Sequence, residues 1–387
     1  MLDIGPIHRR EYEIDSGRSD SVVKAQAPGR IHFLGEHGAP LGGLFLSAAI
    51  DRYVKVAVSP RRDNSLRFFT PHLGERKRTT LANLKYKRED RWANYIKAAI
   101  FLFSTLGVPM KGMNFTLMGD IPLQIGLASS SAIEVAAAVA LKGFLRVKLN
   151  EQELIGRLVD AHRGFFEEEP AAADYLIGIS ARNGQFLLVD EPNLTVTRIP
   201  SPFSRSKIIL MDSRVPRLGV EAELASRRET LKKGLDMLAQ GREGAAFRDF
   251  AAMDLMNAMG HFPEEIRRRS LHVVQEISRV LDTQDYLIRG DLAGFSRLIF
   301  HSHESLRDLY EVSCPEIDWM VKRAQETEGV LGARMMGQGF GGCTYTIIKN
   351  EAVNGYRERL DDYERIFGFH PAIYELKIAA GSKVVAK

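Results

Sequence analysis

The sequence has few cysteines and no long apolar run, which argues against a disulfide framework and against a membrane span. Only Cys314 and Cys343 occur among 387 residues, without CxxC spacing or a histidine-rich neighbourhood. A disulfide framework or a zinc site is therefore not expected. Residues 1–20 lack the apolar core of a signal peptide, and no apolar run approaches the roughly 20 residues of a membrane-spanning helix. We expect a soluble, cytoplasmic protein.

The sequence also lacks an excess of one charge. It has 53 basic and 49 acidic residues, a formal net charge of +4, and its Lys and Arg residues form no long block. The short clusters at residues 61–62 and 267–269 are typical of solvated faces, so neither nucleic acid nor membrane is predicted as a partner. A chain of this length favours two domains.

Turn residues and apolar periodicity predict where the chain is divided. The run of Pro and Ser at residues 200–204 is the best candidate for a domain junction, which predicts domains at residues 1–203 and 204–387. Residues 1–22 resemble a polar lead-in, and residues 221–328 are predicted to be mostly helical. The other predicted elements are strands at 51–58, 185–189, 207–211, 343–348 and 374–378 and a helix at 92–106. This mixture lacks regular βαβ alternation and therefore predicts an α+β fold.

A loop rich in small residues leads directly into a predicted helix. The alanine-rich helix spans residues 131–141, with Gly143 available to end it, and the loop consists of Gly126, Leu127, Ala128, Ser129, Ser130 and Ser131. Its serines could cap the free N–H groups of the helix, or the same N–H groups could bind phosphate. Local chemistry alone leaves both interpretations open.

Three motifs in order make the sequence recognisable. Residues 27–37, 122–135 and 332–344 resemble the first, second and third signatures of the GHMP kinases, and residues 92–95 and 302–316 resemble galactokinases in particular. The resemblance implies the two-domain GHMP kinase fold, with a ribosomal-protein-S5-like N-terminal domain and a ferredoxin-like C-terminal domain, both α+β. It also implies a sugar kinase that uses ATP and Mg²⁺.

Two other nucleotide-binding motifs are excluded. The glycine-rich residues 337–342 evoke a dinucleotide fingerprint, but the strand predicted at 343–348 follows them where that motif requires a helix. No GxxxxGK[ST] is present, so the chain is not a P-loop enzyme.

The resemblance assigns roles on the ATP side and in the chemistry. Asp174 corresponds to the base that accepts the proton of the sugar hydroxyl, and Arg30 to the arginine beside it that stabilises negative charge. Ser130 corresponds to the hydroxyl ligand of Mg²⁺, although a capping role is compatible with the same position. Trp92 and Tyr95 correspond to residues of the adenine pocket, although aromatic residues on a helix are more often core residues.

One part expected from galactokinases is missing. They carry a glutamate that serves the metal site immediately before the histidine of the helix preceding the base, whereas here Ala161 precedes His162. The carboxylates that could substitute are Asp160, Glu167, Glu168 and Glu169, and the sequence does not choose between them.

The sugar-binding side departs from the galactokinase pattern. The resemblance places the following residues at the acceptor: Glu36, His37, Ala39, Leu224, Gly337 and Gly339. Of these, Ala39 stands in place of the pocket aspartate and Leu224 in place of a tyrosine, and residues 171–173 before the base are all alanine. Loss of polar partners weakens recognition of sugar hydroxyls.

These departures lead us to predict an acceptor other than, or in addition to, galactose. It would be a monosaccharide or related polyol phosphorylated at an anomeric or ring hydroxyl, and Arg30 and His32 would suit an acidic sugar. A galactokinase proper and a non-catalytic sensor of ATP or sugar are the alternatives. A mevalonate or homoserine kinase would share the loop but not residues 302–316.

Overall fold

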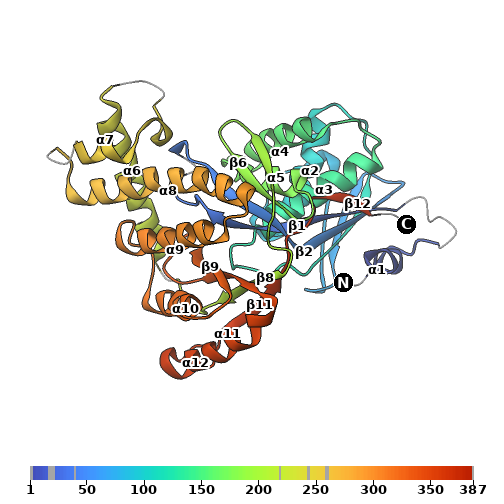
Figure 1. The fold of residues 1–387 in the computed structure, drawn as a ribbon. Coiled ribbons are helices and arrows are strands. Elements are labelled where there is room, and N and C mark those ends of the chain that lie inside the picture. Colours follow the sequence, from blue (N-terminus) through green and yellow to red (C-terminus); the bar gives the residue numbers. More distant parts are fainter. Residues whose placement is uncertain are drawn as a thin grey trace. The chain divides into compact units, whose positions relative to one another are not determined.

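The structure is a computed structural model that describes residues 3–15, 22–38, 41–217, 219–241, 245–257 and 261–385. It is α+β, as predicted (Figure 1). The chain divides into two compact units. Unit 1 comprises Met1–Arg30, Ala49–Asn183 and Ala379–Lys387, and unit 2 comprises Ile31–Ala48 and Gly184–Ile378. Because these units are discontinuous in sequence, they do not follow a single cut, and the domain boundary after residue 203 stays a prediction.

Most strands of unit 1 form one sheet. Its order is β12 (Lys383–Val385), β1 (Val23–Leu34), β2 (Phe45–Pro60), β5 (Met113–Gly119), β3 (Ser65–Thr70) and β4 (Glu75–Thr80). Both β1 and β2 continue into unit 2. The long strand β2 contains the strand predicted at 51–58 and runs antiparallel to β5, with Val54 opposite Gly119.

The helices of unit 1 are α1 (Ile4–Glu11), α2 (Ala93–Thr105), α3 (Ser129–Phe144), α4 (Glu151–Phe166) and α5 (Ala172–Ser180). Helices α2 to α5 pack against one another. The prediction of α2 is confirmed, but α3 continues through Gly143 instead of ending there. A Cβ at Gly143 would lie 3.3 Å from Val384 Cγ2, so this glycine allows close packing against β12 rather than a helix end.

Helix α1 corrects the prediction of a polar lead-in over residues 1–22. The buried imidazole of His8 lies between Thr116 Oγ1 and Ser59 Oγ, at 2.8 Å from each. Burial lowers the pKa of His8 to about 3, so the ring is neutral in the fold. These contacts attach α1 to the sheet, where it packs on β5.

Unit 2 contains a hairpin and a four-stranded antiparallel sheet. The hairpin, β6 (Gln185–Asp190) and β7 (Thr195–Pro200), pairs with the beginning of β2. The sheet has the order β11 (Ala372–Leu376), β8 (Ser206–Asp212), β10 (Cys343–Lys349) and β9 (Val330–Met336). The strands predicted at 185–189, 207–211 and 343–348 are confirmed, and the strand predicted at 374–378 is displaced by two residues.

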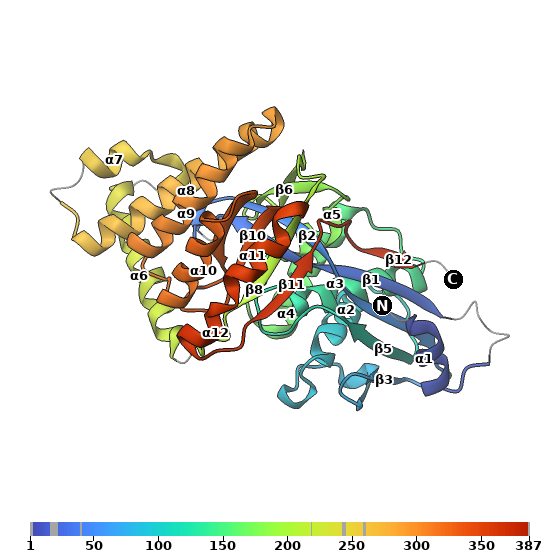
Figure 2. The same ribbon diagram turned by 60° about the horizontal axis from the view of Figure 1, so that its bottom comes forward.

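The helices of unit 2 confirm the mostly helical segment predicted at 221–328. They are α6 (Val220–Ala239), α7 (Ala252–Asn257), α8 (Glu264–Arg289), α9 (Leu292–Asp308), α10 (Pro315–Gln325), α11 (Val353–Leu360) and α12 (Asp362–Phe367). Helix α8 packs against both α6 and α9, which lie beside it in Figure 2, while α9 and α10 pack against β9.

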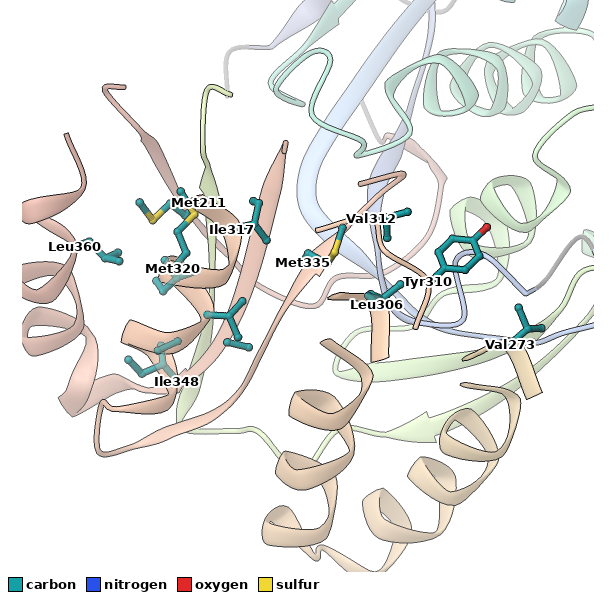
Figure 3. Close-up of a cluster of buried hydrophobic side chains, with 14 of the residues drawn as sticks. Met211, Val273, Leu306, Tyr310, Val312, Ile317, Met320, Met335, Ile348 and Leu360 are labelled. Carbon is teal, nitrogen blue, oxygen red and sulfur yellow. The ribbon is translucent and has the colours of Figure 1, made fainter. Parts of the chain in front are cut away.

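The core of unit 2 lies where these helices meet the four-stranded sheet. Figure 3 shows Met211 from the sheet beside Met320 and Ile317 from α10, and Met335 from the sheet beside Val312. Burial of such apolar surface contributes about 25 cal/mol per Å². Both cysteines are free, as predicted. Among the described residues, no helix combines the length and apolar character needed to cross a membrane.

Candidate active site

The loop before α3 has an unusual backbone. Gln124, Gly126 and Ala128 have φ values of 64°, 82° and 60°, whereas Ile125 and Leu127 between them have no positive φ. Residues with positive φ that alternate with residues of negative φ can turn successive N–H groups toward one concavity, which favours an anion. We call residues 126–131 the cradle.

The first turn of α3 carries no cap. Ala128 is the N-cap residue and provides no side-chain hydrogen bond, so the serines that follow do not cap the helix as one interpretation of the sequence proposed. The N–H groups at the start of a helix have no partner within the helix. In the described part of the chain, the Ser130 hydroxyl has no hydrogen-bond partner either. The positive end of the helix dipole and several donors are therefore open to a ligand.

A charged cluster joins the cradle to α5. Arg30 Nε donates to Asp174 Oδ1 over 2.6 Å, and Ser131 Oγ donates to Asp174 Oδ2 over 2.9 Å. Arg30 Nη1 also donates to the carbonyl of Gly126 over 2.6 Å. Asp174 is 7% exposed. The structure thus brings together Arg30 of the first signature, Gly126 and Ser131 of the second, and the predicted base Asp174.

Close packing of β1 against the loop makes this cluster possible. The backbone N–H of Arg30 donates to the carbonyl of Leu127 over 3.2 Å. A Cβ at Gly29 would lie only 2.9 Å from that same carbonyl oxygen. The glycine before Arg30 is therefore required for the strand to approach the loop.

A buried network beneath the cradle was not predicted. Glu134 Oε2 lies 3.0 Å from His162 Nδ1 and accepts from the Tyr175 hydroxyl over 2.9 Å. Burial raises the pKa of Glu134, which favours its protonated form, although the contact with His162 opposes this shift. Glu134 follows Ser130 by one helical turn, so both side chains lie on the same face of α3.

The network connects the helices that carry the cluster. Tyr175 follows Asp174 on α5, Glu134 lies on α3 and His162 lies on α4. The other carboxyl oxygen of Glu134, Oε1, is buried and has no partner among the described residues. A single glutamate within the alanine-rich helix, one turn after the serine loop, was the signal in the sequence that could have identified Glu134.

Of the carboxylates considered as substitutes for the missing metal ligand, Asp160 and Glu169 lie near Arg163. Asp160 is 65% exposed and lies 3.7 Å from Arg163, and Glu169 is 75% exposed and pairs with Arg163 at 2.8 Å. Glu167 is the C-cap residue of α4. Within the described ranges, no group of three or more His, Cys, Asp or Glu residues could hold a metal ion.

Trp92 and Tyr95 lie at the start of α2 but have different neighbours. Trp92 is 9% exposed and its indole N–H donates to Glu75 Oε2 over 2.9 Å. The Tyr95 ring lies 5.4 Å from Phe166, which also contacts Tyr86. Their role in adenine binding stays a prediction.

The residues predicted on the sugar side lie in unit 2. Glu36 Oε2 accepts from Arg334 Nη1 over 2.7 Å, and Glu36 Oε1 accepts from the backbone N–H of Gly337. Arg334 is fully buried and also contacts Glu276 at 3.2 Å, which pairs with Arg279 at 2.7 Å. Burial alone would raise the pKa of Glu276, but Arg279 and Arg334 hold it below its usual value. We call Glu36, Glu276, Arg279 and Arg334 the charge network.

His37 lies next to this network. Its ring is 4.5 Å from that of Tyr310, which stacks on His272 at 5.0 Å. Burial, followed by the charge of Arg334, lowers the pKa of His37 to about 3, so the ring is neutral. Its Nε2 atom is buried and has no partner in the described part of the protein.

The remaining residues predicted at the acceptor have mainly structural surroundings. Gly339 has a φ of 97°, and a Cβ there would lie 2.5 Å from the carbonyl oxygen of Val312, so only glycine fits. Leu224 is 6% exposed on α6. Ala39 lies outside the described residues.

Family models match three parts of the chain. The model for the GHMP kinases N terminal domain matches residues 94–177, and the model for GHMP kinases C terminal matches residues 283–362. A third model, the galactokinase galactose-binding signature, matches residues 10–60.

Relatives match over nearly the whole chain. A putative galactokinase of Treponema pallidum is 37% identical, with 100% of this chain and 97% of that protein covered. A galactokinase of Roseiflexus is 33% identical over 98% of this chain and 97% of that protein. The crystal structure of Lactococcus lactis galactokinase complexed with galactose matches with a TM-score of 0.88 and 25% identity, covering 99% of this chain and 100% of that one.

Proposed function

The chain belongs to the galactokinase family of the GHMP kinases, and we propose that it is a galactokinase that transfers the γ-phosphoryl group of ATP to the anomeric hydroxyl of galactose. Family membership makes it a sugar kinase with the two-domain GHMP fold. The observation that carries the proposal is the contact of Arg30 and Ser131 with the Asp174 carboxylate beside an uncapped helix start.

In the proposed reaction, Asp174 accepts the proton of the attacking hydroxyl. The sugar oxygen forms a bond to the γ-phosphorus while the bond from that phosphorus to the β–γ bridging oxygen breaks and ADP leaves. The positive charge of Arg30 and the N–H groups of the cradle stabilise negative charge on the phosphoryl oxygens. Hydrogen bonds from two sides fix the carboxylate, so little reorganisation is needed at the moment of transfer.

Mg²⁺ is the metal that this proposal implies, and the residues fit it. The Ser130 hydroxyl has no hydrogen-bond partner among the described residues, and Glu134 Oε1 on the same helix face is an orphaned buried oxygen. Hydroxyl and carboxylate oxygens suit Mg²⁺, which is usually held by few protein ligands together with substrate phosphates and water. Bound Mg²⁺ would neutralise charge on the phosphates of ATP.

Galactose is the acceptor that the comparisons favour. The galactose-binding signature covers residues 10–60, which include Glu36 and His37, and several relatives are galactokinases. The prediction of a different acceptor, drawn from Ala39 and Leu224, is not confirmed. The buried, unpartnered Nε2 of His37 is consistent with a hydrogen-bonding ligand.

The test is to incubate the purified protein with ATP and Mg²⁺ and measure ADP release with galactose, glucose, amino sugars, uronic acids and inositols. Galactose is expected to give the largest kcat/KM, with a product whose phosphate on C1 is visible by ³¹P NMR. Preference for another sugar would refute galactose as the acceptor. Silence across the panel with intact ATP binding would favour the sensor.

Ser130→Ala tests the proposed metal ligand. Loss of one oxygen ligand is expected to raise the Mg²⁺ concentration for half-maximal rate about tenfold, while the KM for galactose changes little. Ser129→Ala is the matched control, because its hydroxyl neighbours Ser130 but is assigned no ligand role. An unchanged magnesium dependence in Ser130→Ala would remove this residue from the metal site.

A further inference from the structure

A cavity lies within unit 1, apart from the cradle. It has a volume of about 460 Å³ and is lined by the C-terminal part of α3, the first turn of α4, the end of α5 and strand β12. Small-molecule pockets usually measure roughly 300–1,000 Å³, so the cavity is large enough for a small ligand.

Three cations line this cavity without an anionic partner. The side chains of Lys142, Arg146 and Lys383 form no hydrogen bond or ion pair with any other described residue. The acidic residue in the lining, Glu151, already pairs with Arg182 at 2.6 Å. The cavity therefore has an excess of uncompensated positive charge.

The rest of the lining is largely apolar. Val139 and Leu154 are 9% and 3% exposed and form part of the wall, and Ile179 is 5% exposed. Val384 leaves 49% of its surface accessible at the same cavity. A ligand that fits this lining needs an apolar part as well as a negative charge.

The helix dipole explains only some of these cations. Lys142 lies in the last turn of α3 and Arg146 follows it, where positive charges offset the negative helix end. Lys383 comes from β12, outside that helix and at the other end of the sequence. Convergence of all three on one partly apolar cavity is better explained by a ligand.

We propose that this cavity binds a small organic anion, with a phosphate or carboxylate head group near Lys142, Arg146 and Lys383 and a short apolar body against Val139 and Leu154. The site does not depend on the acceptor proposed above. Its occupant would contact the ends of α3 and α5 opposite to those that carry Ser131 and Asp174. Binding would therefore stabilise the pair of helices on which the active-site cluster is built.

Calorimetric titration of the full chain with matched probes tests the proposal. Hexyl phosphate and hexanoate combine charge with an apolar body, inorganic phosphate carries charge alone, and 1-hexanol carries the apolar body alone. At least one of the two amphipathic anions is expected to bind at least tenfold more tightly than inorganic phosphate or 1-hexanol. Comparison of the two amphipathic probes distinguishes a phosphate from a carboxylate head group.

Charge-removing variants locate the site. Lys142→Gln, Arg146→Gln and Lys383→Gln are each expected to weaken binding of the better probe about fivefold, as loss of one partly exposed ion pair would. Lys148→Gln is the matched control, because Lys148 is exposed and does not line the cavity. Equal affinity in all four variants, or no advantage of the amphipathic probes, would overturn the proposal whether or not the protein phosphorylates galactose.

Discussion

The cradle and the charge network use polar groups in opposite ways. In the cradle, the start of α3 is uncapped and Ser130 has no hydrogen-bond partner among the described residues. In the charge network, Arg334 is fully buried and contacts Glu36, Glu276, Ser302 and its neighbouring backbone. The cradle lies in the second signature motif of the family, and Glu36 and Arg334 of the charge network lie in the first and third.

This difference separates a region open to a ligand from one that is satisfied internally. Unpaired donors at a helix start cost little when water or an anion can reach them. A buried guanidinium must be paired inside the protein, since an uncompensated buried charge is strongly destabilising. Substitutions that remove a polar side chain at the cradle or its Asp174 cluster should therefore affect turnover first, whereas removal of a charge from the charge network should affect stability first.

Asp174→Asn should have the largest effect. The amide cannot accept the proton from the hydroxyl, so kcat is expected to fall about 10³-fold, within the range for general base catalysis. The KM for ATP should change little, because the cradle is untouched. Steady-state kinetics and thermal unfolding measure the two effects separately.

Asp63→Asn is the control for this substitution. Asp63 pairs with Arg61 at 2.7 Å in the same unit but outside the cluster, so turnover should be unchanged. Wild-type turnover in Asp174→Asn would remove Asp174 as the base.

Arg334→Met should have the next largest effect, on stability. It leaves Glu36 without its cation and Glu276 with Arg279 as its remaining cationic partner, which is expected to cost about 3–5 kcal/mol of unfolding free energy. Urea denaturation measures this loss. Arg323→Met is the control, because the Arg323 side chain is 30% exposed in its pair with Glu326. Comparable losses in the two variants would mean that the charge network does not act as a buried unit.

The sequence was sufficient to predict the helices and strands that depend on local residue patterns. Helix α2 followed from apolar periodicity, and strand β10 followed from the residues after the glycine run. The pairing of Arg30 with Asp174, 144 residues apart, was accessible only through the family resemblance. The network of Glu134, His162 and Tyr175 was missed because its partners are 28 and 41 residues from Glu134 along the chain.

Helix α1 was missed for a related physical reason. Its eight residues are too few to fold alone, and its stability comes from packing and from the hydrogen bonds of His8 to Ser59 and Thr116, which lie 51 and 108 residues away. Helix propensity and the periodicity of apolar residues depend on neighbouring residues only, so they do not reveal such distant contacts.

Acidification should change the free energy of unfolding in opposite directions through the two regions, the charge network and the cradle. His37 and His272 beside the charge network are neutral, with the pKa of His37 lowered to about 3 and that of His272 lowered well below its usual value. In the unfolded chain both histidines bind a proton below about pH 6.5, whereas in the fold they stay neutral. Stability is therefore lost as the pH falls from about 6.5 toward 3. Glu134 has a raised pKa and acts in the opposite direction.

The slope of unfolding free energy against pH measures this difference. Each buried neutral histidine contributes a loss of about 1.4 kcal/mol per pH unit at most between pH 6 and 4. His272→Gln should reduce this slope by up to about 1.4 kcal/mol per pH unit, which corresponds to one proton. His370→Gln should leave the slope unchanged, because the His370 side chain is 84% exposed. An identical slope in the two variants would contradict burial of neutral His272.

Ala128→Gly should have the smallest effect and the opposite sign. Ala128 has a φ of 60° in the loop before α3, a conformation that costs a residue with a Cβ about 1 kcal/mol and glycine almost nothing. The substitution should therefore raise the unfolding free energy by up to about 1 kcal/mol while the KM for ATP stays unchanged. Ala132→Gly, four residues later inside α3, should instead lower it by about 1 kcal/mol. Destabilisation by both substitutions would show that the left-handed backbone at Ala128 is not imposed by the loop, and the anion-binding concavity attributed to the cradle would lose its structural basis.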